Sequence, residues 1–350
     1  MLASISFVGS AALFTGCARL LQRDVDDAAS DEDYHDAVDD LDDVELYSRL
    51  LSSDHEYGKH LRVAVEAALV AGRGDYYTHL STAGTIYSTS LSTTSKSNTS
   101  DFFTEVDVAN EKLIIERIKA SFPSHAIIGE ETSDSSTPQT ISPPTWIIDP
   151  IDGTTNFVAG NALTCVSICY AENDECIIGV VYAPKLNELY IGVKGVGAWL
   201  NGIPIRKLNK DVPADIKSCN ICVEFGYDRS DGIDAMTNTV ATIMRRNVKS
   251  IRMLGSGVLD LVFVALGRLD AVYCGVAGEG WQSWDYAAAS VILKESGGVI
   301  ENWKREEGGE WEEGGKFDIF GTSMVCACNE QVRTSCEYIN YAILVSRTIY

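Results

Sequence analysis

Residues 146–157 read WIIDPIDGTTNF, an apolar run that leads into two aspartates, a proline and a glycine. The β-branched run predicts a strand, and Pro150 predicts its break. Asp152 is expected to cap the segment that follows, and Gly153-Thr154-Thr155 predicts the opening of a helix. Backbone N–H groups at a helix N-terminus bind phosphate. This segment therefore predicts two carboxylates beside a phosphate-binding turn.

Further carboxylates stand at the ends of other predicted elements. The strand HAIIGEE ends in Glu130 and Glu131, and Asp285 opens the helix predicted for WDYAAASVILKESGG, which stops at Gly297-Gly298. Carboxylates gathered in one place repel each other unless protons or cations lie between them. Oxygen ligands select Mg²⁺, Mn²⁺ or Ca²⁺ over zinc, and Mg²⁺ is the default inside cells. The pattern predicts metal-assisted hydrolysis of a phosphate ester.

Composition and charge narrow the class of partner. The 350 residues include 28 basic and 50 acidic side chains, which gives a net charge of −22, and 45% of the residues are hydrophobic. This is the composition of a folded globular protein. The negative charge opposes nucleic acid and anionic membranes, so the expected partner is a small-molecule phosphate ester, with no nucleic acid and no membrane.

The first 54 residues differ from the rest of the chain. Residues 1–17 are uncharged and apolar, and twelve Asp or Glu residues follow between Asp24 and Tyr47 without any Lys or Arg. Such a run predicts a disordered acidic tail. We therefore expect a tail over residues 1–54 and a catalytic domain over residues 55–350. The expected location is cytoplasmic, with organellar or secretory targeting by residues 1–22 as the alternative.

The catalytic domain shows both helical and strand periodicity. Apolar residues from Leu61 to Val70 predict a helix that stops at Gly72, and residues 106–120 predict a second helix. The segments LTCVSICYAEN, CIIGVVYAP and ELYIGVKGVGAWLNG predict an antiparallel meander with a turn at Asn201-Gly202. The ten cysteines lie mostly among apolar residues, which indicates buried thiols. A zinc or redox role for Cys219-x-x-Cys222 is disfavoured, because positions three apart on a strand face opposite ways.

Three motifs carry a resemblance to a known family. GEE at 129–131, WIIDPIDGTTNF at 146–157 and WDYAAASVILKESGG at 284–298 resemble the signatures of the inositol monophosphatase family of magnesium-dependent, lithium-sensitive phosphatases. KSNTSDFFTEVD, GVGAWLNG and IRMLGSG resemble smaller family segments, and the likeness runs from about His55 to the end. The resemblance implies an α/β fold, a layered α-β-α-β-α sandwich of the sugar-phosphatase type. It also implies a homodimer and inhibition by lithium.

The resemblance also assigns roles to residues. It implies that the metal ligands are Glu130, Asp149, the Ile151 carbonyl, Asp152 and Asp285. Thr154 with Glu130 matches the pair that orients and deprotonates the attacking water, and Glu130, Thr154 and Asp152 are the expected catalytic residues. Glu131 matches a position behind the ligands. The expected substrate-binding residues are Asp152, Gly153, Thr154, Gly255, Ser256, Gly257, Glu279 and Asp285. Of these, Gly153 and Thr154 would hold phosphate through their N–H groups.

Two regions leave alternatives open. Lys96, Asp101, Thr104 and Asp107 match a segment that closes over the metals in the family, and each is equally compatible with a solvated loop or a helix cap. Family members that use inositol phosphates commonly have a Glu seven residues before the Asp that here is Asp285. This chain has Gly278 there, with Glu279 next to it as a substitute through a shifted turn or with another role. Tyr227 lies in the substrate-side loop EFGYDRS and is expected to be a surface tyrosine.

The expected function is that of a Mg²⁺-dependent phosphomonoesterase that hydrolyses inositol monophosphate to inositol and phosphate with a metal-activated water. The first alternative is another small ester: a sugar 1-phosphate, histidinol phosphate or phosphoadenosine phosphate. The second is a relative that binds metal and phosphate without turnover.

Overall fold

The computed structural model describes most of the chain after residue 54. It covers residue 50 and residues 55–82, 93–95, 102–134, 137, 139–205, 215–226, 233–275, 281–302, 304–305, 311–312, 317–321 and 323–336. The apolar N-terminal segment, the acidic run, Lys96, Asp101, Tyr227, Gly278 and Glu279 lie outside the described residues, as does the side chain of Thr104.

The described chain contains both helices and strands, and β5 to β9 follow one another without a helix between them. The helices are α4 (Gly58–Thr82), α5 (Glu105–Ser121), α6 (Thr154–Val158), the 3₁₀ turn η1 (Ile216–Ser218), α7 (Ile233–Arg245), α8 (Gly257–Ala265) and α9 (Ser283–Glu295). The strands are β1 (Thr93–Ser95), β2 (Phe102–Thr104), β3 (Ala126–Gly129), β4 (Thr145–Asp152), β5 (Cys165–Glu172), β6 (Glu175–Ala183), β7 (Glu188–Val193), β8 (Gly197–Leu200), β9 (Ile203–Pro204), β10 (Asn220–Val223), β11 (Ser250–Arg252), β12 (Ala271–Cys274), β13 (Val299–Asn302), β14 (Lys304–Arg305), β15 (Trp311–Glu312) and β16 (Met324–Ala327).

Two sheets form the framework. The larger has the order β3-β4-β5-β6-β7-β8-β9, and only its first pair, β3 with β4, is parallel. The predicted antiparallel meander is therefore confirmed. Its turn at Asn201-Gly202 is also confirmed, because both residues have the positive φ that a tight hairpin requires. The smaller sheet has the order β11-β10-β12-β16-β13, in which β10 pairs in parallel with β11 and β12.

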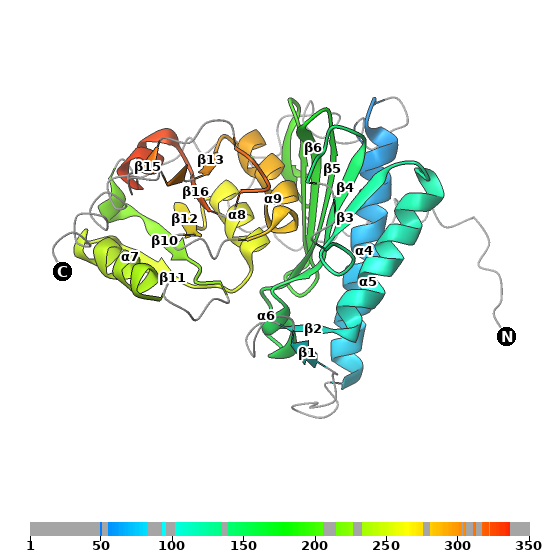
Figure 1. Cartoon of the computed structure of the whole chain (residues 1–350), viewed down its shortest axis with the longest axis horizontal. Helices are drawn as coiled ribbons and strands as arrows, with labels where there is room; N and C mark the ends of the chain where they lie inside the picture. Colours follow the sequence, from blue (N-terminus) through cyan, green and yellow to red (C-terminus); the bar gives the residue numbers. More distant parts are fainter. Residues whose placement is uncertain are drawn as a thin grey trace, which may run out of the picture.

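The helices lie in three layers around these sheets (Figure 1). Helices α4 and α5 pack on the outer face of the large sheet, and α8 and α9 lie between the two sheets. Helix α7 lies on the far side of the small sheet in this view, and its Ile243 belongs to the core that α8 and α9 share with that sheet. This arrangement confirms the α-β-α-β-α sandwich.

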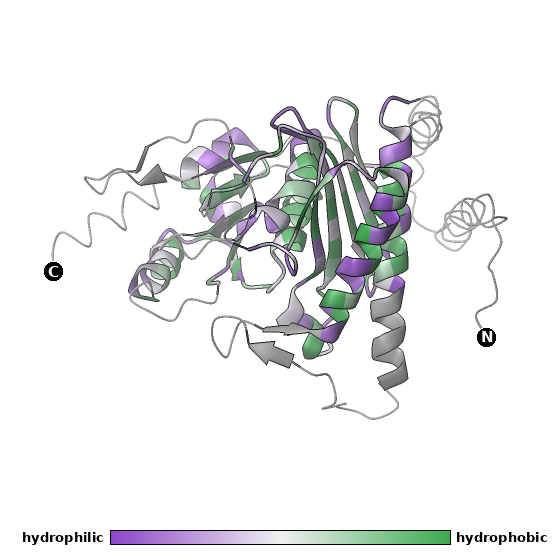
Figure 2. Ribbon diagram, turned by 45° about the vertical axis from the view of Figure 1, so that its right-hand side comes forward, coloured by the Kyte–Doolittle hydropathy of each residue, from purple (hydrophilic) through white to green (hydrophobic). Residues whose placement is uncertain are grey.

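The large sheet is buried on both faces, which explains its long apolar strands. In β4, Trp146 and Ile148 pack toward α4 and α5, whereas Ile147 packs toward α8 and α9. All eight residues of β4 are buried. Figure 2 shows the strands as largely hydrophobic, while the two long helices α4 and α5 carry both hydrophobic and hydrophilic residues. The strand that carries Asp149 and Asp152 is thus held on both sides.

Two local predictions need correction. Helix α4 does not stop at Gly72 but continues to Thr82, and Gly72 stands there because a Cβ would overlap the Tyr182 ring, 2.6 Å from its Cδ1. Pro150 does not end the strand, since β4 continues to Asp152. The proline disturbs only the ladder, where the register with β5 shifts between Asp149 and Asp152.

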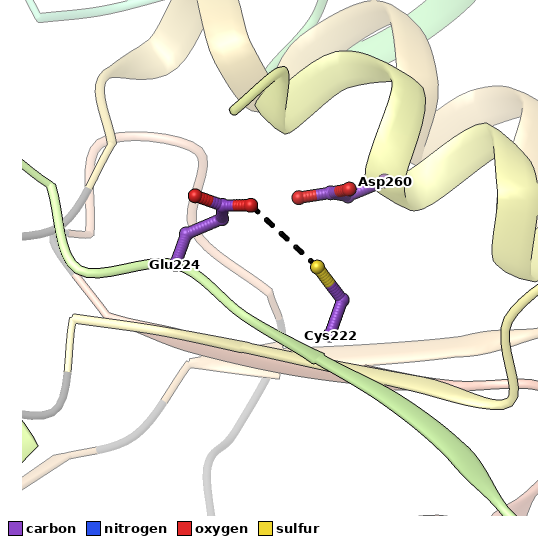
Figure 3. A group of neighbouring side chains, drawn as sticks. All are labelled: Cys222, Glu224 and Asp260. Carbon is purple, nitrogen blue, oxygen red and sulfur yellow. Dashed lines mark hydrogen bonds between the residues drawn. The ribbon is translucent and has the colours of Figure 1, made fainter. Parts of the chain in front are cut away.

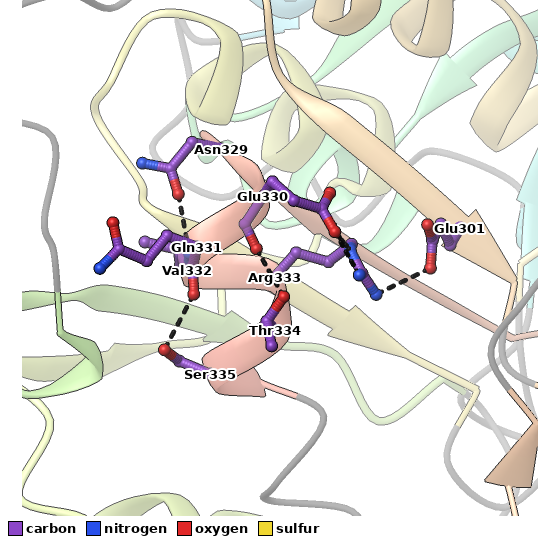
Figure 4. Close-up of polar contacts among 8 residues, drawn as sticks. All are labelled: Glu301, Asn329, Glu330, Gln331, Val332, Arg333, Thr334 and Ser335. Atoms are coloured by element: carbon purple, nitrogen blue, oxygen red, sulfur yellow. Dashed lines mark hydrogen bonds and ion pairs between the residues drawn. The ribbon is translucent and has the colours of Figure 1, made fainter.

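The final part of the chain that the structure describes is a helical segment over residues 330–336, which follows β16. Its Arg333 is 6% exposed and donates to Glu301 of β13 at 2.9 Å and, through Nε, to Glu330 at 2.8 Å (Figure 4). Asn329 Oδ1 accepts the Val332 N–H at 2.7 Å and so caps the first turn. These contacts fasten the segment to β13.

An aromatic cluster closes one end of the layer between α4, α5 and the large sheet. The His60 ring stacks on Phe122 and Tyr170 with centroids 4.3 and 4.4 Å apart. The Trp146 indole N–H donates to Nδ1 of His125 at 3.1 Å, so His125 is an acceptor and therefore neutral at this nitrogen. Burial is the main reason that the pKa of His60 falls to about 4, and the nearby His125 lowers it further.

The contact of β6 with α9 predicts that Gly179→Ala destabilises the protein. A Cβ at this position would overlap the Ala288 carbonyl of α9. Overpacking of this kind costs about 1–3 kcal/mol, and we expect about 3 kcal/mol by urea unfolding. Gly195→Ala is the control, because its Cβ would meet nothing within 4 Å and the cost is only that of its positive φ, about 1 kcal/mol. Equal losses in the two variants would show that α9 is not so closely packed on β6.

The aromatic cluster predicts a loss of stability in acid. Because the folded-state pKa of His60 lies below its unfolded value of about 6.5, the unfolded chain binds more protons between the two values. The contribution of neutral His60 to the free energy of unfolding is fully present above the unfolded pKa. It is lost as the pH drops toward the folded pKa. His60→Phe preserves the stack and removes the titration. We expect the variant to lose about 1 kcal/mol less than the parent between about pH 7.5 and pH 5 in urea titrations, a figure reduced because His60 is only half-buried. Identical losses would contradict this account.

Candidate active site

The site begins where the two parallel strands of the large sheet end. Strands β3 and β4 pair in parallel, so their carboxyl ends meet at the same edge. Glu130 directly follows β3, and its N–H donates to the Ile148 carbonyl of β4 at 3.1 Å. Asp149 and Asp152 lie in the carboxyl-terminal half of β4, where they are 1% and 6% exposed. The sheet topology thus gathers the acids that the sequence placed at two separate strand ends.

The third aspartate comes from the helix layer between the sheets. Asp285 lies in the first turn of α9, and its Oδ2 accepts the Gln282 N–H at 2.6 Å. One carboxylate oxygen from each of Asp149, Asp152 and Asp285 lies within 4.8 Å of the others. Glu130 is not in this closest group, yet its charge is the largest contribution to the raised pKa of Asp149 after burial.

The residues fit a divalent cation. Burial raises the pKa of Asp149 well above its usual range, and Glu130, Asp152, Asp285 and Asp107 raise it further. Burial also raises the pKa of Asp152 to about 6, although four hydrogen bonds oppose the rise. Ionised carboxylates this close are unfavourable without positive charge between them. An all-oxygen donor set suits Mg²⁺, Mn²⁺ or Ca²⁺.

The role predicted for Asp152 as a cap of the following helix is wrong. The N-cap of α6 is Gly153, whose φ of 82° places it in the left-handed region, and no side chain caps this helix. Asp152 instead accepts the N–H groups of Gly257 and Val258, each at 3.1 Å, and the Ser256 hydroxyl at a shorter distance. It therefore caps α8, more than one hundred residues away, because the fold brings the N-terminus of α8 to the end of β4.

Gly153 is required by its surroundings. A Cβ there would lie 2.9 Å from the Leu163 carbonyl oxygen and 3.0 Å from that of Gly255, and its φ is positive. The next residue, Thr154, begins α6. The phosphate-binding role of these two N–H groups remains a prediction.

Thr154 is held by two acceptors. It is 8% exposed, and its hydroxyl lies 3.2 Å from the Ile151 carbonyl and 3.4 Å from Oδ1 of Asp107. Asp107 is fully buried in the first turn of α5. Among the four residues of the predicted closing segment, Asp107 is the one whose side chain the structure describes. It is neither a solvated loop residue nor an exposed helix cap, since it contacts the expected catalytic threonine.

Residues 254–257, here called the substrate-side turn, lie next to this centre. The Asn156 amide donates to the Leu254 carbonyl at 2.7 Å and to the Gly255 carbonyl at 3.1 Å. Gly255 is exposed, whereas Ser256 and Gly257 are buried through their contacts with Asp152. Gly255 is therefore the residue of the three whose position suits contact with a ligand, and the predicted substrate role of all three remains a prediction.

The structure adds residues that the sequence analysis did not single out. Glu111 of α5 is buried, and its carboxylate accepts the Glu131 N–H at 2.8 Å, which supports the backbone after β3. Asn156 and Glu224 bind opposite sides of the substrate-side turn. Asn156 lies inside the motif WIIDPIDGTTNF, so its place in that motif could have identified it. Glu111 looks like one charged residue among many in a helical segment.

A layered α/β fold with buried carboxylates at the end of its central sheet defines the class of metal-dependent phosphatases. Residues 58–339 match the model of the inositol monophosphatase family. Inositol monophosphatase of Mesembryanthemum crystallinum is 42% identical over 202 residues, which are 57% of this chain and 72% of that protein. Inositol monophosphatase 1 of Bos taurus is 34% identical over 237 residues, 67% of this chain and 80% of that protein.

A comparison of structures agrees. The crystal structure of the extragenic suppressor protein suhB from Bartonella henselae superposes with a TM-score of 0.67 at 27% identity, over 81% of this chain and 98% of that one. The chain belongs to the inositol monophosphatase family. Among the helices that the structure describes, none has the length and hydrophobicity needed to cross a membrane.

The contact between Thr154 and Asp107 predicts that Asp107→Ala lowers activity. Without Asp107 the threonine hydroxyl loses one of the two acceptors that orient it. We therefore expect kcat to fall by about 10–100-fold at saturating metal. Glu105→Gln, an exposed change in the same turn of α5, is the control and is expected to leave kcat unchanged. An Asp107→Ala enzyme with normal kcat would contradict a role in orienting Thr154.

Proposed function

We propose that this protein hydrolyses inositol monophosphate to inositol and phosphate with Mg²⁺ as its metal. The observation that carries the proposal is the convergence of Asp149, Asp152 and Asp285 at the end of β4, in a chain that matches the inositol monophosphatase family over residues 58–339. This convergence supports a hydrolase that neutralises the charge of a phosphate ester with cations.

The metal would be held by Glu130, Asp149, Asp152, Asp285 and the Ile151 carbonyl. When bound, it supplies positive charge that stabilises the charge developing on the phosphate and lowers the pKa of water. The Ile151 N–H donates to Asp149 Oδ1 at 3.0 Å, which fixes the backbone between the two aspartates and with it the direction of the Ile151 carbonyl.

Thr154 and Glu130 would handle the proton of the attacking water. The single hydrogen of the Thr154 hydroxyl is donated to the Ile151 carbonyl or to Asp107, so the oxygen lone pairs are left to accept a hydrogen bond from that water. The Glu130 carboxylate would take the water's proton as general base. Gly153 and Thr154 would hold the phosphate through their N–H groups.

The alcohol side of the ester would meet the substrate-side turn and Asp152. Asp152 is hydrogen-bonded by the N-terminus of α8 and the turn by Asn156, so these contacts would hold the surface in place before substrate binds. We also propose inhibition by Li⁺, a homodimer and the domain limits 55–350. A second phosphate ester, such as a sugar 1-phosphate, is the competing substrate, because Glu279 stands one residue from the usual family position.

The proposal predicts that Asp149→Asn abolishes hydrolysis while the fold stays intact. The variant keeps the size of the side chain but removes one negative charge from the proposed ligand set, so we expect kcat/KM to fall at least about 10³-fold. Phosphate release from inositol 1-phosphate is measured with and without Mg²⁺ and then against Li⁺, and circular dichroism checks the fold.

The outcomes separate the candidate functions. Mg²⁺-dependent release blocked by Li⁺ supports the proposal, and full activity of Asp149→Asn contradicts the metal assignment. A preference of tenfold or more for another ester would retain the hydrolytic site and replace the substrate. Absence of turnover with every ester, together with measurable Mg²⁺ and phosphate binding, would favour the binding protein.

A further inference from the structure

Glu224 supports the substrate-side turn from the side opposite Asn156. It follows β10 directly, and its Oε1 accepts the Leu254 N–H at 2.7 Å and the Gly255 N–H at 2.9 Å. The Cys222 thiol donates to the same oxygen over 3.6 Å. Glu224 thus carries a charge-assisted pair of hydrogen bonds to the turn that would face the alcohol.

A second carboxyl group lies against Glu224. Asp260, in the first turn of α8, is fully buried, and none of the described residues makes a well-formed hydrogen bond to either of its oxygens. The nearby Cys222 thiol is a weak donor and lowers the pKa of Asp260 only in part. One oxygen of Asp260, one of Glu224 and the Cys222 sulfur lie within 4.8 Å of one another. Figure 3 shows the Asp260 carboxyl group directed from α8 toward Glu224, with Cys222 on the strand below.

An ionised Asp260 would be unfavourable here. A buried carboxylate with no donor loses its solvation without compensation, and the neighbouring Glu224 charge adds repulsion. The other titratable groups that act on Asp260 are Asp152 of β4, which is acidic, and the thiols of Cys222 and Cys326. Burial, then Glu224, then Asp152 raise the pKa of Asp260 well above its usual range.

A proton fits this cluster better than a metal ion. The Cys222 thiol keeps its hydrogen, because burial raises its pKa and it donates to Glu224. Glu224 Oε1 already accepts from two backbone N–H groups. A carboxyl proton on Asp260 satisfies the remaining need, since it turns an orphaned acceptor into a donor for the Glu224 carboxylate.

We propose that Glu224 is a positioning residue for the substrate-side turn, and that Asp260 holds Glu224 in place as a neutral carboxylic acid that donates a hydrogen bond to it. The pair connects β10 and α8 to the substrate-side turn, whose Ser256 and Gly257 bind Asp152 of the large sheet. It therefore sets where the alcohol-facing backbone lies relative to the centre. This role in substrate binding rests on the proposed function.

The test compares substitutions that keep the proposed hydrogen bond with substitutions that remove its donor or its acceptor. Asp260→Asn keeps a neutral donor of the same shape, Asp260→Leu removes it, and Glu224→Leu removes the acceptor. Glu116→Gln, an exposed change on α5, is the matched control. KM and kcat are measured for inositol 1-phosphate and for p-nitrophenyl phosphate, whose leaving group lacks the inositol hydroxyls.

We expect Asp260→Asn to stay within about twofold of the parent, and both leucine variants to raise KM for inositol 1-phosphate about tenfold or more, as expected for the loss of a charge-assisted hydrogen bond. Their kcat for p-nitrophenyl phosphate should change little. If Asp260→Asn is as defective as Asp260→Leu, Asp260 acts as an anion, and loss of one bound metal equivalent in that variant would establish a cation site. Normal KM in both leucine variants overturns the proposal.

A second measurement does not depend on hydrolysis. Hydrogen exchange at the Leu254 and Gly255 amides reports their bonds to Glu224 directly. Exchange should be faster in Asp260→Leu and Glu224→Leu and unchanged in Asp260→Asn and in the control. If the parent protein hydrolyses no ester, this result still decides the positioning role, whereas the substrate assignment fails separately. Unchanged exchange in every variant overturns the positioning role.

Discussion

The contact between Asp152 and the N-terminus of α8 connects the two halves of this molecule. Asp152 ends the buried strand β4 of the large sheet, and its carboxylate accepts from the backbone of Gly257 and Val258 and from the Ser256 hydroxyl. These donors carry the partial positive charge of the helix, which offsets part of the cost of burying the carboxylate. The same contact determines how close the small sheet and the substrate-side turn come to the proposed ligands, so the geometry of the site follows from it.

The remaining carboxylates depend on this arrangement but receive less compensation. Asp149 has one described donor, the Ile151 N–H, and it is surrounded by Glu130, Asp152, Asp285 and Asp107. Four acids raise the pKa of Asp149 in addition to burial, so a bound cation would relieve their mutual repulsion. The carboxylates of the centre repel one another, and the packing of Trp146, Ile147 and Ile148 on the two faces of β4 keeps them close together.

Much of the fold and of the centre could be predicted because the signals are local. Strand ends, the helix that begins near Asp285 and the hairpin at Asn201-Gly202 depend on a few neighbouring residues, and the quoted motifs carried the resemblance to the family. The partners of these residues could not be predicted, because they depend on segments distant in the sequence. Asp152 caps α8 instead of α6, and Asp107 contacts Thr154 from α5. Gly72 lies inside α4, where Tyr182 of β6 leaves no room for a Cβ. The capping preference of an aspartate predicts that it will accept N–H groups, but only the packing of the two sheets decides whose.

Buried carboxylates need a positive charge or a proton beside them, and the two acidic clusters of this protein are proposed to meet that need differently. At the end of β4 several carboxylates meet, and protonating them all would remove the ligands, so a cation is the suitable counter-charge. Beside β10 two carboxyl groups and a thiol meet among the described residues, and Glu224 Oε1 accepts the Leu254 and Gly255 amides. One proton on Asp260 satisfies that pair and also supplies a directional hydrogen bond to Glu224. Asn156 binds the Leu254 and Gly255 carbonyls of the substrate-side turn, and Glu224 binds their N–H groups. The backbone polar groups of these two residues are therefore hydrogen-bonded before any ligand binds.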